Sequence, residues 1–414
     1  MIRLSILFNI VLLIFGCDNN QNTEENNTKE SHQEDAIENT TFEKFLGDNY
    51  NVGNYIQDTD TSIIVVGAKY NNDADGSRDI WIVSINNSGK IVWGKTVCKG
   101  KYFLPRSIIK SPNGNYLIAG QIKSENQINH RSLIDIYLIE IDQYGKLIWE
   151  KTYTANTRFE TKKCMLQTID NSILIVSNSV HYYDDINFTD QTAFTNLYKI
   201  NIHGDLLWRK EIQRKCTDGG VFAAVSCTDG GFLFAGNDCD DFLDKTAWTF
   251  KTDINGNLLW SKYYRELQGL YLIDIIKCDD NSYWVAGEQL IGEQKHAWIS
   301  KIDDFGNVMW DTIYSEKRRH LHLSSLYLCA DKGLLIVGSQ ETLRYGTIEA
   351  LIIKTDANGK EEWRRIFDDK DFLYIDNIMQ LSDGSIFTLG RVYLGNQKRK
   401  DWIMKLNESG RLEE

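Results

Sequence analysis

The stretch that decides the fold of this chain reads DINGNLLW and covers residues 253–260. Gly256 follows Asp253 by three residues, and Trp260 follows the glycine by four. The side chain of an Asp or Asn can bind its own backbone two residues further on, and a glycine can adopt the positive φ that a bulged hairpin needs. The stretch therefore predicts a tight hairpin between two strands.

The same spacing of Asp or Asn, Gly and Trp occurs seven times along the chain. The copies are Asn86/Gly89/Trp93, Asp142/Gly145/Trp149, Asn201/Gly204/Trp208, Asp253/Gly256/Trp260, Asp303/Gly306/Trp310, Asp356/Gly359/Trp363 and Asn407/Gly410, where Glu414 takes the place of Trp. Consecutive glycines of this set are 50 to 59 residues apart. Self-similarity at so regular a period is the signature of a repeat architecture.

A second motif alternates with the first and consists of three or four apolar residues closed by a small residue. The small residues are Gly67, Gly120, Ser177, Gly236, Gly287, Gly338 and Gly390. Turn residues such as Asp229-Gly230-Gly231 usually precede this motif, and a further apolar stretch such as 271–277 lies before them. Each repeat therefore holds four strands, which we name a, b, c and d in chain order. The continuously apolar stretches 116–119 and 351–353 predict strands that are buried on both faces.

Four-stranded units repeated seven times are typical of a β-propeller. We therefore expect an all-β fold over residues 41–414, a seven-bladed propeller of four-stranded antiparallel blades. The last repeat lacks its Trp strand, but residues 42–45 (FEKF) match Trp149-Glu150-Lys151 with Phe in the place of Trp. We expect this N-terminal strand to complete the seventh blade beside residues 401–407.

Two side-chain types repeat together with the hairpin. The Trp residues stand at a fixed place in six repeats and are expected to pack between neighbouring blades. A cation recurs two positions after the Trp, as Lys95, Lys151, Lys210, Lys262 and Arg365. On an outer strand such charges discourage pairing with the edge of another molecule.

These motifs resemble those of two propeller families. The hairpin with its Trp is similar to the tryptophan-docking repeat of pyrroloquinoline-quinone-type (PQQ-like) propellers, although that repeat has one more residue between Asp and Gly. A strand b that ends in Gly, followed by strand c and a Trp-bearing strand d, resembles kelch, although kelch repeats carry a double glycine. The resemblance implies the fold and no activity. It implies no cofactor, because the quinone-dependent enzymes use a vicinal cysteine pair that this sequence lacks.

Residues 1–16 have the plan of a secretory signal peptide. Arg3 precedes an apolar run over residues 4–15, which is shorter than the roughly 20 residues that span a bilayer. The run ends at Gly16-Cys17 and resembles the lipobox of bacterial lipoproteins, whose cysteine is acylated and becomes the mature N-terminus. We expect lipidation at Cys17, and the alternative is an ordinary signal peptide with an incidental cysteine.

Residues 17–40 are predicted to form an acidic, disordered tether. From Asp18 to Thr40 the chain holds seven acidic residues, one base and no aromatic residue, which is too little apolar surface to offset the entropy of folding.

We expect an extracytoplasmic, lipid-anchored protein of the cell envelope, periplasmic or at the cell surface, with the outer membrane as its anchor. The net charge of −12 disfavours a nucleic-acid partner, because phosphate binding needs a local basic excess.

The predicted topology separates two faces of the propeller. The a-b and c-d turns lie on one face, which we name the turn face, and the b-c and d-a loops lie on the other, the loop face. Variable loops carry function on repeat scaffolds, so we expect a ligand on the loop face. The candidate residues combine aromatic and acidic side chains with cations, which suits a sugar or a basic peptide, unless they are ordinary loop residues. They are His181, Tyr182, Tyr183, Asp184, Asp185, Asp238, Asp240, Asp241, Phe242, Arg318, Arg319 and His320.

The cysteines after Cys17 fall into two groups. Cys227, Cys278 and Cys329 occupy the same repeat position at the end of strand a and are expected to be small buried residues. Cys216 lies in the d-a loop before repeat 4 and Cys239 in the b-c loop of that repeat, so both belong to the loop face. They are candidates for a disulfide, with Cys98 and Cys164 as competing partners.

The sequence offers no motif of a known catalytic site. It contains no nucleophile elbow, phosphate-binding loop or dinucleotide fingerprint. His320-Leu321-His322 places two imidazoles on one face of a strand, but the nearby sequence offers no third metal ligand. The acidic clusters at 73–79 and 238–244 suit either calcium or solvated loops. We therefore predict no catalytic residue, no metal and no cofactor.

Three classes of function remain open, since fold alone does not decide function. The class we prefer is a monomeric, non-catalytic binding or adaptor scaffold for a protein or glycan of the envelope. The second is a glycan-active or other hydrolytic enzyme, which a convergent carboxylate pair with a raised pKa on the loop face would favour. The third is a component of an outer-membrane assembly or secretion complex, by analogy with the propeller lipoprotein of the barrel-assembly complex.

Overall fold

The chain divides into two units, residues 1–38, which lie outside the described residues, and residues 39–414, which form a compact unit. A computed structural model describes residues 41–45, 50–59, 62–70, 78–101, 103–123, 134–153, 157–158, 165–182, 191–217, 219–239, 245–342, 346–368, 373–394 and 398–412. The predicted signal peptide, Cys17 and the tether lie outside the described residues and stay predictions. Within the described ranges, no helix has the length and hydropathy needed to cross a bilayer.

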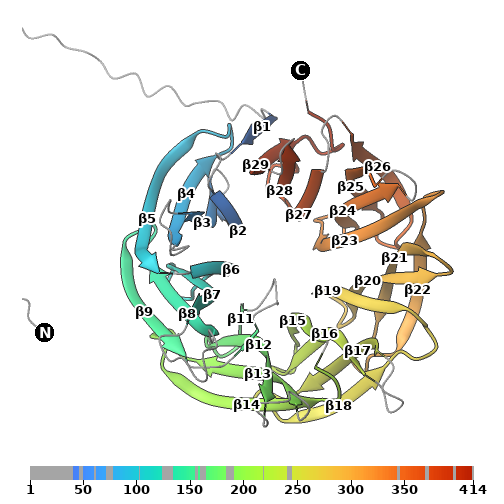
Figure 1. Ribbon diagram of the computed structural model, residues 1–414, viewed down its shortest axis with the longest axis horizontal. Helices are drawn as coiled ribbons and strands as arrows, with labels where there is room; N and C mark the ends of the chain where they lie inside the picture. Colours follow the sequence, from blue (N-terminus) through green and yellow to red (C-terminus); the bar gives the residue numbers. More distant parts are fainter. Residues whose placement is uncertain are drawn as a thin grey trace, which may run out of the picture. The chain divides into compact units, whose positions relative to one another are not determined.

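The second unit is an all-β ring of seven antiparallel sheets, each of which forms one blade (Figure 1). Blade 1 contains β2 (Tyr50–Thr59), β3 (Ser62–Tyr70), β4 (Arg78–Asn86) and β5 (Ile91–Lys101), and blade 2 contains β6 (Phe103–Lys110), β7 (Tyr116–Lys123), β8 (Ile134–Ile141) and β9 (Leu147–Tyr153). Blade 3 contains β10 (Thr157–Arg158), β11 (Met165–Gln167), β12 (Ile173–Tyr182), β13 (Gln191–Ile200) and β14 (Leu206–Arg214). Blade 4 contains β15 (Gly220–Ser226), β16 (Phe232–Cys239), β17 (Lys245–Thr252) and β18 (Leu258–Tyr263), and blade 5 contains β19 (Leu270–Lys277), β20 (Tyr283–Ile291), β21 (Gln294–Ile302) and β22 (Val308–Tyr314). Blade 6 contains β23 (Arg319–Leu328), β24 (Leu334–Thr342), β25 (Ile348–Thr355) and β26 (Glu361–Phe367), and blade 7 contains β27 (Leu373–Gln380), β28 (Ile386–Leu394), β29 (Lys398–Leu406) and β1 (Phe42–Phe45). The predicted seven-bladed propeller is confirmed.

The N-terminal strand closes the ring as predicted. Strand β1 pairs antiparallel with β29, with Phe42 opposite Lys405 and Phe45 opposite Trp402. Blade 7 is therefore assembled from both ends of the propeller sequence. Blade 3 differs from the expected four strands, because its inner strand is split into β10 and β11, which both pair with β12.

The repeated Trp of each blade packs against the hairpin glycine of the next blade. A Cβ added to Gly256, whose φ is +76°, would lie 2.7 Å from the ring of Trp208, so only glycine fits between the ring and the turn. The pairs are Trp93 and Gly145, Trp149 and Gly204, Trp208 and Gly256, Trp260 and Gly306, Trp310 and Gly359, and Trp363 and Gly410. Phe42 packs against Gly89 in the same way and completes the circle. The predicted inter-blade role of these Trp residues is confirmed.

Cations two positions after the repeated Trp residues also reach the next blade. Lys151 Nζ lies 2.7 Å from Asp205, and Lys262 Nζ donates to Asn307 over 2.7 Å. Arg365 donates to the Ser409 carbonyl over 2.8 Å. These side chains therefore hold neighbouring blades together at the c-d turns, a contact that the prediction of edge protection did not include.

A buried lysine at the end of strand c is a second repeated feature, which the sequence analysis missed. Five lysines bind an Asp in the a-b turn of their own blade, as the pairs Lys199–Asp170, Lys251–Asp229, Lys301–Asp280, Lys354–Asp331 and Lys405–Asp383. The hydrogen bond from Lys301 lowers the pKa of Asp280 to about 2. In blade 2 the position is Glu140, which accepts hydrogen bonds from the amides of Asn113 and Asn115 over 2.7 and 2.9 Å.

The core lies between the blades. The stretches 116–119 and 351–353 are no more than 2% exposed, so their predicted burial on both faces is confirmed. One apolar cluster combines Trp284 and Ile299 of blade 5 with Leu321 and Ile336 of blade 6. Stacking of blades thus buries strands that no single blade could cover.

Candidate binding face

The structure describes only part of the predicted ligand-binding set. Tyr183, Asp184, Asp185, Asp240, Asp241 and Phe242 lie outside the described residues. His181 and Tyr182 end strand β12, and their backbone alone is described. The predicted residues with described side chains are Asp238, Arg318, Arg319 and His320.

Asp238 is fully buried and binds groups of its own protein. Its carboxylate accepts hydrogen bonds from the backbone N–H groups of Lys215 and Cys216 over 3.0 and 3.1 Å, and from the Tyr263 hydroxyl over 3.2 Å. The residue therefore fixes the d-a loop between β14 and β15. A ligand would have to displace three hydrogen bonds to reach it.

Cys216 and Cys239 form a disulfide beside Asp238, with a Cα–Cα distance of 5.4 Å. The bridge joins the d-a loop to the end of β16 on the loop face, as the topology predicts. The thiol of Cys98 donates to the carboxylate of Glu150 over 3.3 Å and forms no disulfide with the described cysteines, and Cys164 lies outside the described residues. Burial raises the pKa of the Cys227 thiol to about 11, which keeps this thiol protonated and unreactive.

The remaining predicted residues lie at the junction of blades 5 and 6. Arg318 is an exposed turn residue with a φ of +59°. Arg319 forms an ion pair with Glu349, and the His320 Nδ1 accepts the backbone N–H of Lys295 over 3.1 Å. Arg319 and His320 thus bind neighbouring strands, while Arg318 faces solvent.

An inter-blade bridge that blades 3 and 4 make on the same face is altered at this junction. In blade 3, Asn178 accepts the N–H of Val221 and donates to its carbonyl, both over 3.0 Å. Asn237 of blade 4 makes the same two bonds to Leu272 of blade 5, over 3.0 and 3.2 Å. Each Asn directly follows the small residue of strand b, so its amide ties strand b to the inner strand of the next blade.

In blade 5 this bridging position is Glu288. Its carboxylate accepts the N–H of Leu323 over 3.1 Å but has no proton for the carbonyl. It binds Lys295 Nζ at 3.1 Å and lies 3.5 Å from the Nδ1 of His322. The Nε2 of His322 lies 3.3 Å from a carboxylate oxygen of Glu341. We name Glu288, Lys295, His322 and Glu341 the junction cluster.

The junction cluster is charged and within reach of solvent. The side chains of Glu288, His322 and Glu341 are 14%, 31% and 36% exposed. The hydrogen bond to Glu288 raises the pKa of His322, although burial opposes this shift. Burial raises the pKa of Glu288, but the hydrogen bond and charge of His322 outweigh this, and the pKa of Glu288 is lowered. Glu288 is therefore a stable carboxylate at neutral pH.

Blade 7 carries a second cluster at the corresponding ends of its strands. Arg391 occupies the bridging position, and its guanidinium lies 5.1 Å from the Tyr374 ring and 3.3 Å from the carboxylate of Asp376. The rings of Tyr374 and Tyr393 meet edge to face at 5.9 Å. We name Tyr374, Asp376, Arg391 and Tyr393 the blade 7 cluster. It offers aromatic faces, a cation and an acid, all of them partly exposed.

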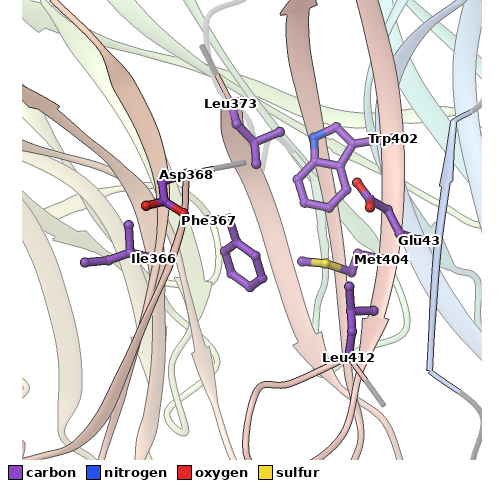
Figure 2. Close-up of a pocket in the computed structure, with 8 residues that line it drawn as sticks. All are labelled: Glu43, Ile366, Phe367, Asp368, Leu373, Trp402, Met404 and Leu412. Atoms are coloured by element: carbon purple, nitrogen blue, oxygen red, sulfur yellow. The ribbon is translucent and has the colours of Figure 1, made fainter. Parts of the chain in front are cut away.

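A pocket of about 260 Å³ lies between blades 6 and 7. It is lined by Glu43, Ile366, Phe367, Asp368, Leu373, Trp402, Met404 and Leu412. Figure 2 shows Phe367 on one side of it and Trp402 with Met404 on the other. The pocket borders the N-terminal strand and holds none of the predicted ligand-binding residues. Among the described residues, no group of three or more potential ligands is placed to hold a metal ion.

Comparisons with known proteins support the fold. The sequence matches no protein-family model and no curated protein. The polysaccharide lyase Uly1 is similar in structure, with 10% identity, a TM-score of 0.50, and coverage of 92% of this chain and 94% of that chain. A chain from a study of two prolyl endopeptidases has 11% identity and a TM-score of 0.50, with coverage of 88% of this chain and 48% of that chain. A protein of unknown function from Dyadobacter fermentans has 12% identity and a TM-score of 0.46, over 74% of this chain and 95% of that chain. The likeness to the first two structures shows the propeller fold alone.

Proposed function

We propose that this chain is a lipid-anchored, extracytoplasmic propeller that binds a glycan on its loop face without modifying it. The observation that supports this most is the change of residue type at one repeated position. Asn178 and Asn237 use it to tie blades together, whereas Glu288 and Arg391 place opposite charges there. Of the seven residues at this position only Glu288 and Arg391 are charged, and departures from a local pattern are expected at functional sites.

The chemistry of the two clusters suits a sugar. Carboxylates and guanidinium groups bind sugar hydroxyls, and a tyrosine ring offers an apolar face with a polar tip. Tyr374, Arg391 and Glu341 present these three kinds of group on the loop face of blades 6 and 7. Burial raises the pKa of Tyr374, and the negative charge of Glu341 adds to this shift. The two side chains therefore interact electrostatically across the junction of blades 6 and 7.

The ionisation of Glu288 argues against one role in hydrolysis. Glycoside hydrolysis by two carboxyl groups needs one of them protonated near neutral pH, and therefore a raised pKa. The pKa of Glu288 is lowered, because His322 holds its carboxylate. Glu288 is therefore suited to accept hydrogen bonds from a ligand and not to act as the protonated carboxyl group of a hydrolase.

A binding experiment tests the loop face. We expect the full chain to bind at least one member of a panel of soluble neutral and acidic polysaccharides, with affinity reduced at least tenfold in the Tyr374→Ala and Arg391→Gln variants, about 1.4 kcal/mol of binding free energy. Tyr144→Ala is the matched control, because Tyr144 is exposed on the turn face. Equal binding by the Tyr374→Ala variant would contradict the site, and a shortened polysaccharide after incubation would contradict a non-catalytic role.

The anchor is tested at Cys17. The Cys17→Ser substitution removes the acylated thiol, so we expect the chain to lose the mass of its acyl groups and to move from the membrane fraction to the soluble fraction. Intact-mass spectrometry and fractionation of the bacterial envelope measure both. Membrane fractionation that does not change in the Cys17→Ser protein would overturn the anchoring.

A further inference from the structure

Exposed apolar side chains recur at one place on the turn face. In blades 1 to 5 the residue directly before the repeated Trp is apolar and 49% to 61% exposed. These residues are Val92, Ile148, Leu207, Leu259 and Met309. We name these five residues the apolar arc. Two hairpin tips on the same face add exposed aromatic rings, Tyr144 at 63% and Phe305 at 69%.

The fold itself does not require apolar residues in the arc. In blade 6 the equivalent residue is Glu362, yet Trp363 still packs against Gly410 of the next blade. Exposed apolar surface that the fold does not require is a candidate for contact with a partner or a membrane. The five half-exposed side chains of the arc offer apolar surface to an occupant outside the propeller.

The chain enters the propeller on this same face. Phe42, the first residue of β1, lies opposite Lys405, next to the turn that follows β29 at Leu406. Lys44 of β1 donates to the Gly89 carbonyl over 3.1 Å, so the strand borders the c-d turn of blade 1, where Val92 begins the arc. The segment that carries Cys17 thus joins the propeller at the turn face.

We propose that the turn face of blades 1 to 5 lies against the lipid bilayer, with the apolar arc in contact with acyl chains. This inference rests on the proposed lipid anchor at Cys17. The tether predicted over residues 17–40 would, as a random coil of that length, have an r.m.s. end-to-end distance of about 25 to 30 Å, so an anchored Cys17 would keep the turn face close to the membrane. Tyr144 and Phe305 suit the interface, where aromatic rings are enriched.

The proposed orientation also keeps the proposed glycan site away from the membrane. Strand order places the junction cluster and the blade 7 cluster at the opposite ends of the strands from the arc. With the turn face against the membrane, the loop face points away from it. A glycan can then reach Tyr374 and Arg391 without competing with lipid.

The test uses the lipidated full chain in vesicles of phosphatidylethanolamine and phosphatidylglycerol that contain a phospholipid with a photoreactive diazirine in its acyl chain. After illumination, peptides with lipid adducts are identified by mass spectrometry. We expect adducts on peptides that contain Val92, Leu207, Leu259 and Met309. We expect none on Leu290 and Ile291, an equally exposed apolar pair on the loop face.

Matched variants give the proposal a second measurement. The triple substitution Leu207→Gln, Leu259→Gln, Met309→Gln should lower the adduct yield at these hairpins at least fivefold, whereas Leu290→Gln with Ile291→Gln should leave it unchanged, at equal thermal stability. Adducts concentrated on the loop face would overturn the proposal, as would a dimer of the Cys17→Ser protein that the triple substitution dissociates. A chain without acyl mass would overturn the anchor itself, which separates the two failures.

Discussion

At the residue scale, the absence of a side chain at the hairpin glycine allows neighbouring blades to pack. Gly256 has a φ of +76°, and the Trp208 ring occupies the place where a Cβ would stand. The glycine thus serves the turn in its own blade and the packing of the preceding blade. Gly114 has a φ of +85° with no atom near its Cβ position, so it serves the turn alone.

This difference allows the two roles to be measured separately. Gly114→Ala should lower the free energy of unfolding by about 1 to 2 kcal/mol, the cost of the left-handed backbone for an L-residue. Gly256→Ala should cost about 1 to 3 kcal/mol more, because the methyl group also displaces Trp208. Urea denaturation of both variants measures this. Equal losses would show that the ring contact does not contribute.

A second prediction concerns the charge of Glu288. The raised pKa of His322 contributes stability when His322 is protonated, which is lost as the pH rises through the folded pKa. The lowered pKa of Glu288 contributes stability that is lost as the pH falls through its folded pKa. The pair therefore stabilises most between the ordinary pKa values of Glu and His, roughly pH 4.5 to 6.5.

The isosteric variant Glu288→Gln isolates this charge, because the amide oxygen still accepts the N–H of Leu323. We expect it to lower the free energy of unfolding on the order of 1 kcal/mol at pH 5.5 and by less at pH 8.5. Chemical denaturation at several pH values measures the difference. Glu266→Gln, at an exposed glutamate, should show no such trend. A loss that grows towards alkaline pH would contradict the assigned pair.

At the scale of the element, β1 decides whether the ring is closed. It has only four residues, yet it supplies the outer strand of blade 7 and the aromatic ring that packs against Gly89. Phe42 also packs against the apolar cluster between blades 7 and 1, which contains Phe387 and Ile403. Loss of this strand exposes the edge of β29 and opens the junction between the first and last blades.

Truncation of Phe42 tests this closure. Phe42→Ala should lower the free energy of unfolding by about 2 to 4 kcal/mol, because a partly buried ring is lost from an inter-blade cluster. Phe305→Ala is the control, since Phe305 is 69% exposed and should change stability little. Thermal and urea unfolding measure both variants. An unchanged midpoint for Phe42→Ala would show that β1 does not hold the ring.

At the scale of the whole molecule, most of the repeated contacts and the departures from the repeat lie on opposite faces. The turn face carries the Trp and glycine contacts and the buried Lys–Asp pairs, which recur in most blades. The loop face carries the departures from the repeat, namely Glu288, Arg391 and the disulfide of blade 4. A repeated contact must satisfy the same geometry in every blade, whereas a residue at a loop end can change without disturbing the neighbours.

The sequence by itself determined the blade count, the strand order, the closure by residues 42–45 and the pairing of Cys216 with Cys239 as one possibility among several. Each of these follows from local spacing, because Gly, Asp and Trp act within one hairpin and the hairpins recur at a regular period.

Only the tertiary structure decided which residues meet across blades. Glu288, His322 and Glu341 come from three strands of two blades, and Arg391 meets Tyr374 from a neighbouring strand. The sequence predicts Asp238 as an exposed acidic residue in a loop. In the fold its carboxylate is buried, because backbone N–H groups of the d-a loop donate hydrogen bonds to it. Contacts of this kind depend on how the ring brings separate strands together, and no period in a single sequence records them.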